Sequence, residues 1–260
     1  MNGKGGTGKS TLAALLVEYV CAKKGGSVLA IDADPNSNLP ELLGVKDAPS
    51  IVGIVEDVQK HLDKLPSGIT KDRFIEMKVQ EAVSEEAKGF DLLTMGRPEG
   101  PGCYCYVNNL LRGIISKITK NYDLVIIDNA AGMEHISRRT MRRIDKLLLV
   151  SDYSVFGVRS AKKIYDLARE MGIDLGETYL VVNKLTGDIG ALQLEVDASG
   201  LELGGAIPFD ERLASLSVSG RSIFNLYDAA LRSEVEAIFQ KAMKSQVRET
   251  YGHRAGKGKI

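Results

Sequence analysis

The 260-residue chain has no net charge, few cysteines and no long apolar run, and each of these shortages excludes a class of protein. Its 34 basic residues balance its 34 acidic residues, so no overall field favours a nucleic acid or an anionic membrane as its partner. Its three cysteines are too few for a disulfide framework in a chain of this size. No apolar run reaches the ~18–20 residues that span a bilayer, and no charged-then-apolar leader opens the chain. We therefore expect a globular cytoplasmic protein.

A complete phosphate-binding motif stands at the start of the chain, in Gly3–Ser10 (GKGGTGKS). In the pattern G-x-x-x-x-G-K-[ST], the glycines let the backbone curl so that successive N–H groups converge on phosphate oxygens at a helix N-terminus. Lys9 is expected to reach the β- and γ-phosphates, and the Ser10 hydroxyl to ligate Mg²⁺. The residues predicted to bind the nucleotide here are Gly5, Gly6, Thr7, Gly8, Lys9, Ser10 and Thr11.

Only Met1 and Asn2 precede this motif, although such a loop normally follows a buried central strand. Either the true start lies upstream, or the sequence is a fragment, or the sheet has a gap, and we expect an incomplete N-terminus. If the chain is complete, we expect weak nucleotide binding and low stability. Adding roughly 7–10 apolar residues upstream, an ordinary strand length, should raise the melting temperature and tighten ATP binding.

Short apolar runs alternate with amphipathic segments along the chain, which predicts an α/β fold with a mostly parallel sheet between two layers of helices. Ligands bind such sheets at the carboxyl ends of the strands. We expect a single domain over residues 1–250 and a disordered tail over 251–260. The expected strands are Ser27–Ala33, Phe90–Met95, Leu124–Asp128, Leu147–Ser151, Tyr179–Asn183 and Gly205–Phe209. The expected helices are Lys9–Lys24, Tyr106–Lys120, Phe156–Met171 and Asp228–Met243.

The second lysine of the motif, Lys4, narrows the class of phosphate-binding proteins. The string KGGTGKS resembles the deviant Walker A motif of the MinD/ParA/Mrp group of P-loop ATPases. The resemblance implies that Lys4 acts catalytically across a dimer interface on the partner subunit's nucleotide, as an arginine finger does. The alternative is a solvated loop lysine.

Three further segments match that group in order. Asp32 and Asp34 lie in D-x-D-P, directly after the apolar run Ser27–Ile31. The resemblance implies that Asp34 activates the attacking water and that Asp32 organises Mg²⁺ and the loop. The alternative is that both only cap the strand end. Asp128 ends an apolar run, as a Walker B aspartate does, and the next residues, NAAG, resemble switch II. Asn183 would read the base edge and Pro208 would pack near the adenine. ATP is favoured over GTP because the guanine-reading N-K-x-D motif is absent.

Cys103 and Cys105 form a C-x-C pair among glycines and a proline. Two thiolates fill only half of a tetrahedral soft-metal site, so the pair alone could equally be two buried cysteines. Two copies facing each other in a twofold dimer would supply four thiolates.

The strings Met95–Cys105 and Asp128–His135, together with the deviant loop, resemble the CooC-type accessory ATPases, which insert nickel into carbon monoxide dehydrogenase. The resemblance implies a homodimer that binds Ni²⁺ or Zn²⁺ through Cys103 and Cys105 and delivers nickel in an ATP cycle. An AcsF-like ATPase serving acetyl-CoA synthase fits almost equally well. An Mrp-type iron–sulfur carrier is a further alternative, but such carriers usually have C-x-x-C and this chain has C-x-C. A ParA/MinD-type positioning protein is less favoured, because the C-x-C pair would have no function in it.

Overall fold

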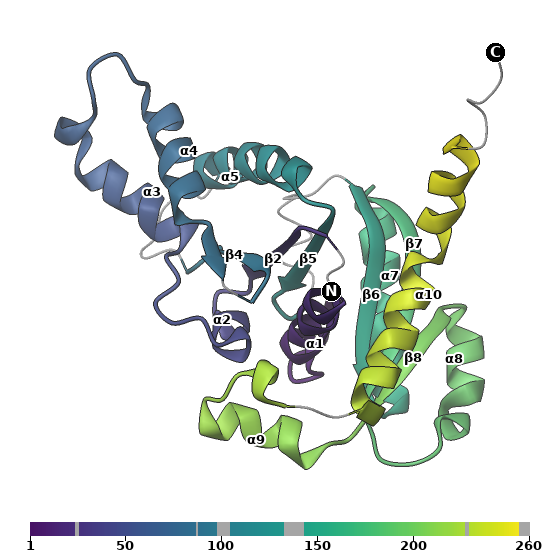
Figure 1. Cartoon of the computed structure of the whole chain (residues 1–260). Helices are drawn as coiled ribbons and strands as arrows, with labels where there is room; N and C mark the ends of the chain where they lie inside the picture. The colour runs from purple at the N-terminus through teal and green to yellow at the C-terminus, as the bar shows by residue number, and fades with distance from the viewer. Residues whose placement is uncertain (24–25, 87, 98–104, 133–142, 227–228, 255–260) are drawn as a thin grey trace.

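The computed structural model describes the whole chain except residues 24–25, 87, 98–104, 133–142, 227–228 and 255–260 (Figure 1). Its strands are β1 (Asn2–Gly3), β2 (Val28–Ala33), β3 (Ser84–Glu86), β4 (Phe90–Thr94), β5 (Leu124–Asn129), β6 (Arg143–Asp152), β7 (Asp174–Leu185) and β8 (Glu202–Pro208). Its helices are α1 (Lys9–Ala22), α2 (Asn38–Leu43), α3 (Ile51–Lys60), α4 (Lys71–Ala82), α5 (Cys105–Ile118), α7 (Val155–Glu170), α8 (Gln193–Ser199), α9 (Glu211–Ser219) and α10 (Ala229–Arg254).

The strands form two four-stranded sheets, in the orders β3-β4-β2-β5 and β1-β6-β7-β8. Every pairing is parallel except that of the short edge strand β3 with β4. β2 reads VLAIDA and is buried along its whole length, as expected of a parallel strand covered on both faces. The predicted mostly parallel α/β sheet is confirmed.

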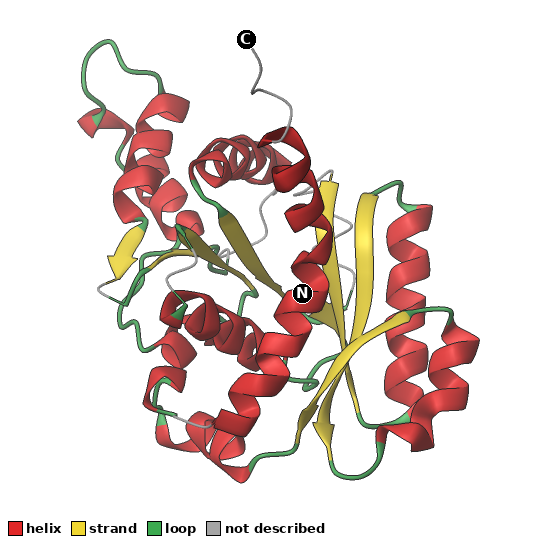
Figure 2. Ribbon diagram, turned by 45° about the vertical axis from the view of Figure 1, so that its right-hand side comes forward, coloured by secondary structure: helices red, strands yellow, loops and turns green. Residues whose placement is uncertain are grey.

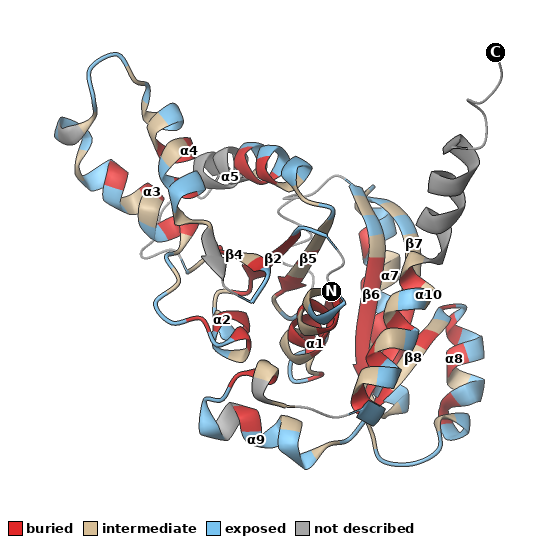
Figure 3. Cartoon of the chain, viewed as in Figure 1, coloured by how far each residue is buried: buried red, intermediate tan, exposed pale blue. Residues whose placement is uncertain are grey.

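Helices cover both faces of the sheets, so the fold has three layers (Figure 2). One core is shared by both sheets, and α1, α2, α9 and α10 pack into it. On the opposite face, each sheet has a core of its own. Helices α3, α4 and α5 pack on the sheet that contains β2. Helices α7 and α8 pack on the sheet that contains β6. Helix α1 is the most deeply enclosed of these helices, with buried residues on nearly every turn, so the motif at its N-terminus has a rigid base (Figure 3).

Two findings concern the ends of the chain. Asn2 and the first residue of the motif, Gly3, form the two-residue strand β1, which pairs with Leu149 and Val150 of β6. At the other end, α10 runs on to Arg254, four residues into the segment predicted to be disordered. Residues 255–260 lie outside the described part of the chain.

Other differences concern element length and existence. Strands β6 and β7 begin four and five residues earlier than predicted, because their amino-terminal halves are polar and half-exposed and lack an apolar run. Strand β3 and helices α2, α3, α4, α8 and α9 were not predicted. The α3 and α4 N-termini are capped by Ser50 and Thr70, whose hydroxyls accept hydrogen bonds from the N–H groups of Gly53 and Arg73. Within the described ranges, no helix is both long and apolar enough to cross a membrane.

Candidate nucleotide site

The predicted phosphate loop links β1 to α1 and adopts a tight turn. Gly6 and Gly8 have φ of 78° and 87°, in the left-handed region that favours glycine. The Thr7 hydroxyl donates to the Lys4 carbonyl at 2.9 Å, and the buried Lys9 ammonium donates to the same carbonyl at 3.4 Å. Lys9 is thus held back against the loop by one long hydrogen bond, which an anionic ligand could readily replace.

Three predicted carboxylates lie at the neighbouring strand ends. Asp32 and Asp128 are opposite each other in the β2–β5 ladder, and both are fully buried. Asp32 accepts hydrogen bonds from the backbone N–H groups of Asp34 (2.9 Å) and Leu39 (3.1 Å), so it fixes the loop that follows β2. Burial is the main reason that the pKa of Asp32 rises to about 7, and the charge of Asp128 adds to it.

Asp128 has the properties of a magnesium ligand. Neither of its carboxylate oxygens has a hydrogen-bond partner among the described residues, and an unpaired buried carboxylate is costly. Burial raises the pKa of Asp128, an effect that the nearby Ser10 hydroxyl and the positive charges of the Met1 amino group and Lys9 oppose. Carboxylate and hydroxyl oxygens are ligands that Mg²⁺ prefers. Asp128 and Ser10 therefore fit a Mg²⁺ ion that bridges the strand end and the phosphate loop.

The start of the predicted switch II is bonded to the loop entry. The Gly132 N–H donates to the Gly3 carbonyl at 3.1 Å, and the Asn129 side-chain amide donates to the Met1 carbonyl at 3.0 Å. The segment after Asp128 is therefore in contact with β1 before residues 133–142, which lie outside the described chain.

A cavity of about 510 Å³ opens beside the phosphate loop. Several residues that were predicted separately line it together: Gly5, Gly6, Gly8, Lys9, Ser10, Thr11, Asp34, Asn183 and Pro208. Three of the predicted residues are buried and do not line the cavity: Thr7, Asp32 and Asp128. Lys4 is exposed beside the cavity. Phe209 and Leu213 add an apolar wall to the cavity.

Asn183 makes a contact that the sequence did not indicate. Its side-chain amide donates to the Thr7 carbonyl at 2.8 Å, and a Cβ at Gly8 would approach its amide nitrogen to 2.2 Å. Only glycine at position 8 leaves room for this contact. The predicted role of Asn183 at the base edge remains a prediction, because its amide is directed at the phosphate loop here.

Lys184 was missed as a site residue. Its ammonium donates to the Gly6 carbonyl at 2.8 Å, and its φ of 57° is unusual for a residue with a side chain. The Asn-Lys pair was visible in the sequence. Its contact with a loop some 180 positions earlier depends on the order of strands in the sheet and has no local signal.

We expect Lys184→Met to weaken ATP binding about five-fold, because a net hydrogen bond at an exposed site is worth about 1 kcal/mol. Lys184→Arg, which keeps a cation at this position, should retain most of the affinity. Isothermal titration calorimetry with Mg·ATP measures both variants. Equal affinity of the Lys184→Met variant and the unchanged protein would show that the contact does not support the loop.

The predicted metal-binding cysteines lie at the edge of what the structure describes. Cys103 is outside the described residues, and Cys105 is the first residue of α5, with a side chain that is not described. Among the described side chains, no cluster of three or more His, Cys, Asp or Glu could hold a metal ion. The third cysteine, Cys21, is half-buried and bonds to the Gly89 carbonyl; burial raises its pKa to about 11, so it is a poor thiolate ligand.

Comparison with known proteins agrees with this geometry. The family described as the CobQ/CobB/MinD/ParA nucleotide binding domain matches residues 1–223. An uncharacterised ATP-binding protein of Methanocaldococcus jannaschii is 39% identical over 95% of this chain and 98% of its own length. The carbon monoxide dehydrogenase accessory protein CooC of Rhodospirillum rubrum is 29% identical over 97% of this chain and 98% of its own.

Solved structures show the same fold. The MinD cell division protein of Aquifex aeolicus superposes with a TM-score of 0.65 at 24% identity, covering 95% of this chain and 94% of that one. Apo McdA of Cyanthece gives a TM-score of 0.68 at 20% identity, over 93% and 96% of the two chains. With its phosphate loop, its strand-end carboxylates and this match over most of its length, the chain belongs to the CobQ/CobB/MinD/ParA family of nucleotide-binding domains.

Proposed function

We propose that this protein is an ATP-dependent metallochaperone that delivers nickel to the active-site cluster of carbon monoxide dehydrogenase. The observation that carries the proposal is the C-x-C pair of Cys103 and Cys105 in the sequence, in a nucleotide-binding chain that is similar to CooC over nearly its whole length. The same chain also carries the second lysine, Lys4, in its phosphate loop.

In this proposal the residues of the cavity bind and hydrolyse ATP. The loop N–H groups and Lys9 bind the phosphates, and Asp34 orients the attacking water. Ser10 and Asp128 would hold Mg²⁺, which supplies positive charge next to the transferred phosphoryl group. Asp34 lines the cavity beside Lys9 and Ser10, as this role requires.

Dimerisation links the ATP cycle to the metal. Lys4 is exposed beside the cavity and is free to reach a second subunit's nucleotide. Two chains joined through ATP would bring together two C-x-C pairs, which make four soft ligands for Ni²⁺ or Zn²⁺. After hydrolysis the subunits separate, each keeps two thiolates, and the affinity for the metal falls. ATP thereby shifts the population between a binding and a releasing state.

The decisive experiment mixes the protein, Ni²⁺ and Mg·ATP with nickel-free carbon monoxide dehydrogenase, and separately with nickel-free acetyl-CoA synthase. We expect activation of the dehydrogenase, and none with the Lys9→Ala variant, which lacks the phosphate-binding ammonium. Activation of the synthase alone would transfer the proposal to the AcsF-like alternative. Activation of neither enzyme, with ATP hydrolysis intact, would overturn nickel delivery.

A further inference from the structure

One buried hydroxyl near the nucleotide cavity has no hydrogen-bond partner. Thr94, the last residue of β4, is 4% exposed, and its Oγ1 bonds to none of the residues that the structure describes. A buried hydroxyl without a partner is unfavourable, and native proteins contain few of them. A second arrangement of the surrounding loop would supply the partner.

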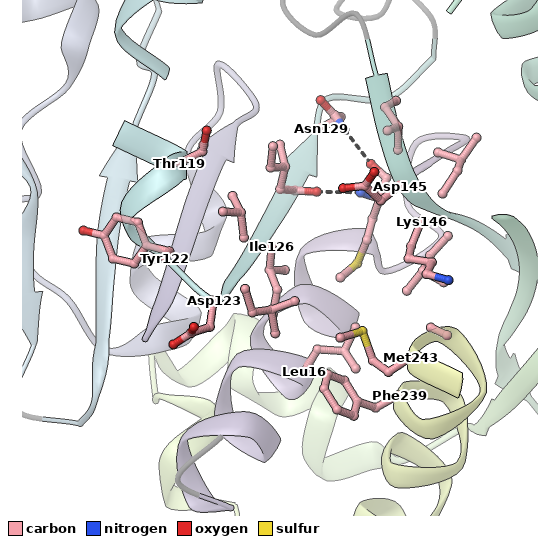
Figure 4. A pocket seen from close by; sticks show the side chains of 18 of the residues that line it. Leu16, Thr119, Tyr122, Asp123, Ile126, Asn129, Asp145, Lys146, Phe239 and Met243 are labelled. Atoms are coloured by element: carbon pink, nitrogen blue, oxygen red, sulfur yellow. Dashed lines mark hydrogen bonds between the residues drawn. The ribbon is translucent and has the colours of Figure 1, made fainter. Parts of the chain in front are cut away.

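Thr94 lies beside the two buried carboxylates of the site. In the ladders of β4, β2 and β5, one row across the sheet contains Thr94, Asp32 and Asp128 (Figure 1). All three face α1 and α2, because the side chains two residues before them belong to the core of those helices: Leu92, Ala30 and Ile126. Figure 4 shows Ile126 of β5 above Leu16 of α1, which belongs to the same core. Since neighbouring strands are ~4.8 Å apart, the Thr94 hydroxyl reaches the Asp32 carboxylate by rotation about one side-chain bond.

The loop that Asp32 holds contains a second anomaly, at Ser37. This residue is the N-cap of α2, but its φ of 49° lies in the left-handed region and its side chain makes no capping hydrogen bond. The N-cap residues of α3, α4 and α7 have an extended backbone, and their hydroxyls accept hydrogen bonds from the helix. The Ser37 hydroxyl has only a 3.4 Å hydrogen bond to the Asp34 carbonyl. Ser37 therefore has a strained backbone and lacks the hydrogen bond typical of its position.

Asp32 takes the place of the missing cap. An N-cap side chain accepts from the second or third N–H of the helix, and in α2 these positions are Leu39 and Pro40. Proline has no N–H, so Leu39 is the donor that α2 offers to Ser37. In this structure the Leu39 N–H donates instead to Asp32 Oδ2 at 3.1 Å, while Asp32 Oδ1 accepts from Asp34. Asp32 and Ser37 therefore compete for one N–H group.

We propose that Thr94 is a positioning residue for the loop over 34–38, which it holds in a nucleotide-bound form through Asp32. In that form Ser37 has an extended backbone and caps Leu39 itself. The Thr94 hydroxyl donates to the carboxylate oxygen that Leu39 releases. One exchange of hydrogen bonds thus removes the strain at Ser37, supplies the missing cap and satisfies Thr94.

The nucleotide drives the exchange through Asp34. In the form described here the loop is held by its own turn, in which the N–H groups of Ser37 and Asn36 donate to the Asp34 carbonyl and carboxylate, both at 2.9 Å. In the proposed function Asp34 orients the attacking water, which takes its carboxylate away from Asn36 and opens the turn. Asp34, Asn36 and Asn38 line the cavity on both sides of Ser37, so a bound nucleotide contacts this loop and shifts its population. The inference rests on the ATP-dependent part of the proposed function and is independent of nickel.

The test compares Thr94→Val with a matched control, Thr178→Val. Among the described residues, Thr178 of β7 also has a buried hydroxyl without a partner, and it does not line the nucleotide cavity. Both variants should raise the Tm of the nucleotide-free protein by about 3 °C, because each replaces an unpaired hydroxyl by a methyl group. In calorimetry with Mg²⁺ and a non-hydrolysable ATP analogue, Thr94→Val alone should bind about ten-fold more weakly, since it loses a hydrogen bond to a charged group only in the bound form.

Two further readouts separate positioning from a purely structural role. Thr94→Ser keeps the hydroxyl and should restore the affinity. In steady-state hydrolysis, Thr94→Val should raise KM about ten-fold with kcat nearly unchanged, because saturating ATP still populates the bound form.

Equal affinity of Thr94→Val and Thr178→Val for the analogue would overturn the inference. A lower Tm of nucleotide-free Thr94→Val would also overturn it, because the hydroxyl would then have a partner in that state. If the unchanged protein fails to bind the analogue, the proposed function fails and the inference fails with it.

Discussion

Replacing Lys4 by alanine should leave ATP binding nearly unchanged but abolish ATP-dependent dimerisation and lower the hydrolysis rate by about a thousand-fold. We expect this separation because the phosphate loop is hydrogen-bonded to the backbone of Lys4 and not to its side chain. Its carbonyl accepts hydrogen bonds from Thr7 and Lys9, and alanine keeps that carbonyl, whereas its side chain is exposed. A cation supplied to a partner's phosphoryl transfer contributes ~10³–10⁵ in rate, as arginine fingers show.

Light scattering with Mg·ATP and a phosphate-release assay test this prediction. The control is Lys9→Ala, which removes a buried ammonium from the phosphate loop itself and should lose ATP binding along with hydrolysis. A Lys4→Ala variant that still dimerises and hydrolyses ATP at the normal rate would show that Lys4 is a solvated loop residue.

Replacing both Cys103 and Cys105 by alanine should abolish nickel binding while ATP hydrolysis continues. A shared tetrahedral site takes two thiolates from each chain, so the double variant leaves no ligand in either half. We expect the bound nickel, measured by elemental analysis after gel filtration with Mg·ATP, to fall to background.

The chain supplies its own control in Cys21. This thiol is half-buried against the Gly89 carbonyl, far in sequence from the C-x-C pair, and its raised pKa disfavours the thiolate. Cys21→Ala should therefore retain the full metal content. Unaltered metal in the double variant, or loss of metal in Cys21→Ala, would refute the assignment of the C-x-C pair.

The sequence predicted best those features that are encoded locally. The phosphate loop depends on Gly6 and Gly8 at fixed spacing, and the structure gives both the expected left-handed backbone. Asp32 and Asp128 each end an apolar run, and parallel pairing then places them opposite each other. The predicted order of strands and helices was sufficient to place these groups at one edge of the sheet.

Features that depend on distant residues were not predictable in the same way. The Lys184 ammonium meets Gly6 only because β7 and β1 both lie next to β6. The amino-terminal halves of β6 and β7 carry alternating charged residues, such as Lys146 and Glu177, which pair across the ladder and give no apolar run.

The two-chain mechanism is tested most directly by counting metal and protein in one complex. The protein is loaded with Ni²⁺ and a non-hydrolysable ATP analogue and analysed by native mass spectrometry. We expect a dimer that holds one nickel for two chains and two nucleotides, and a monomer without nickel when ADP replaces the analogue. A monomer that binds nickel equally well with either nucleotide would contradict the shared site.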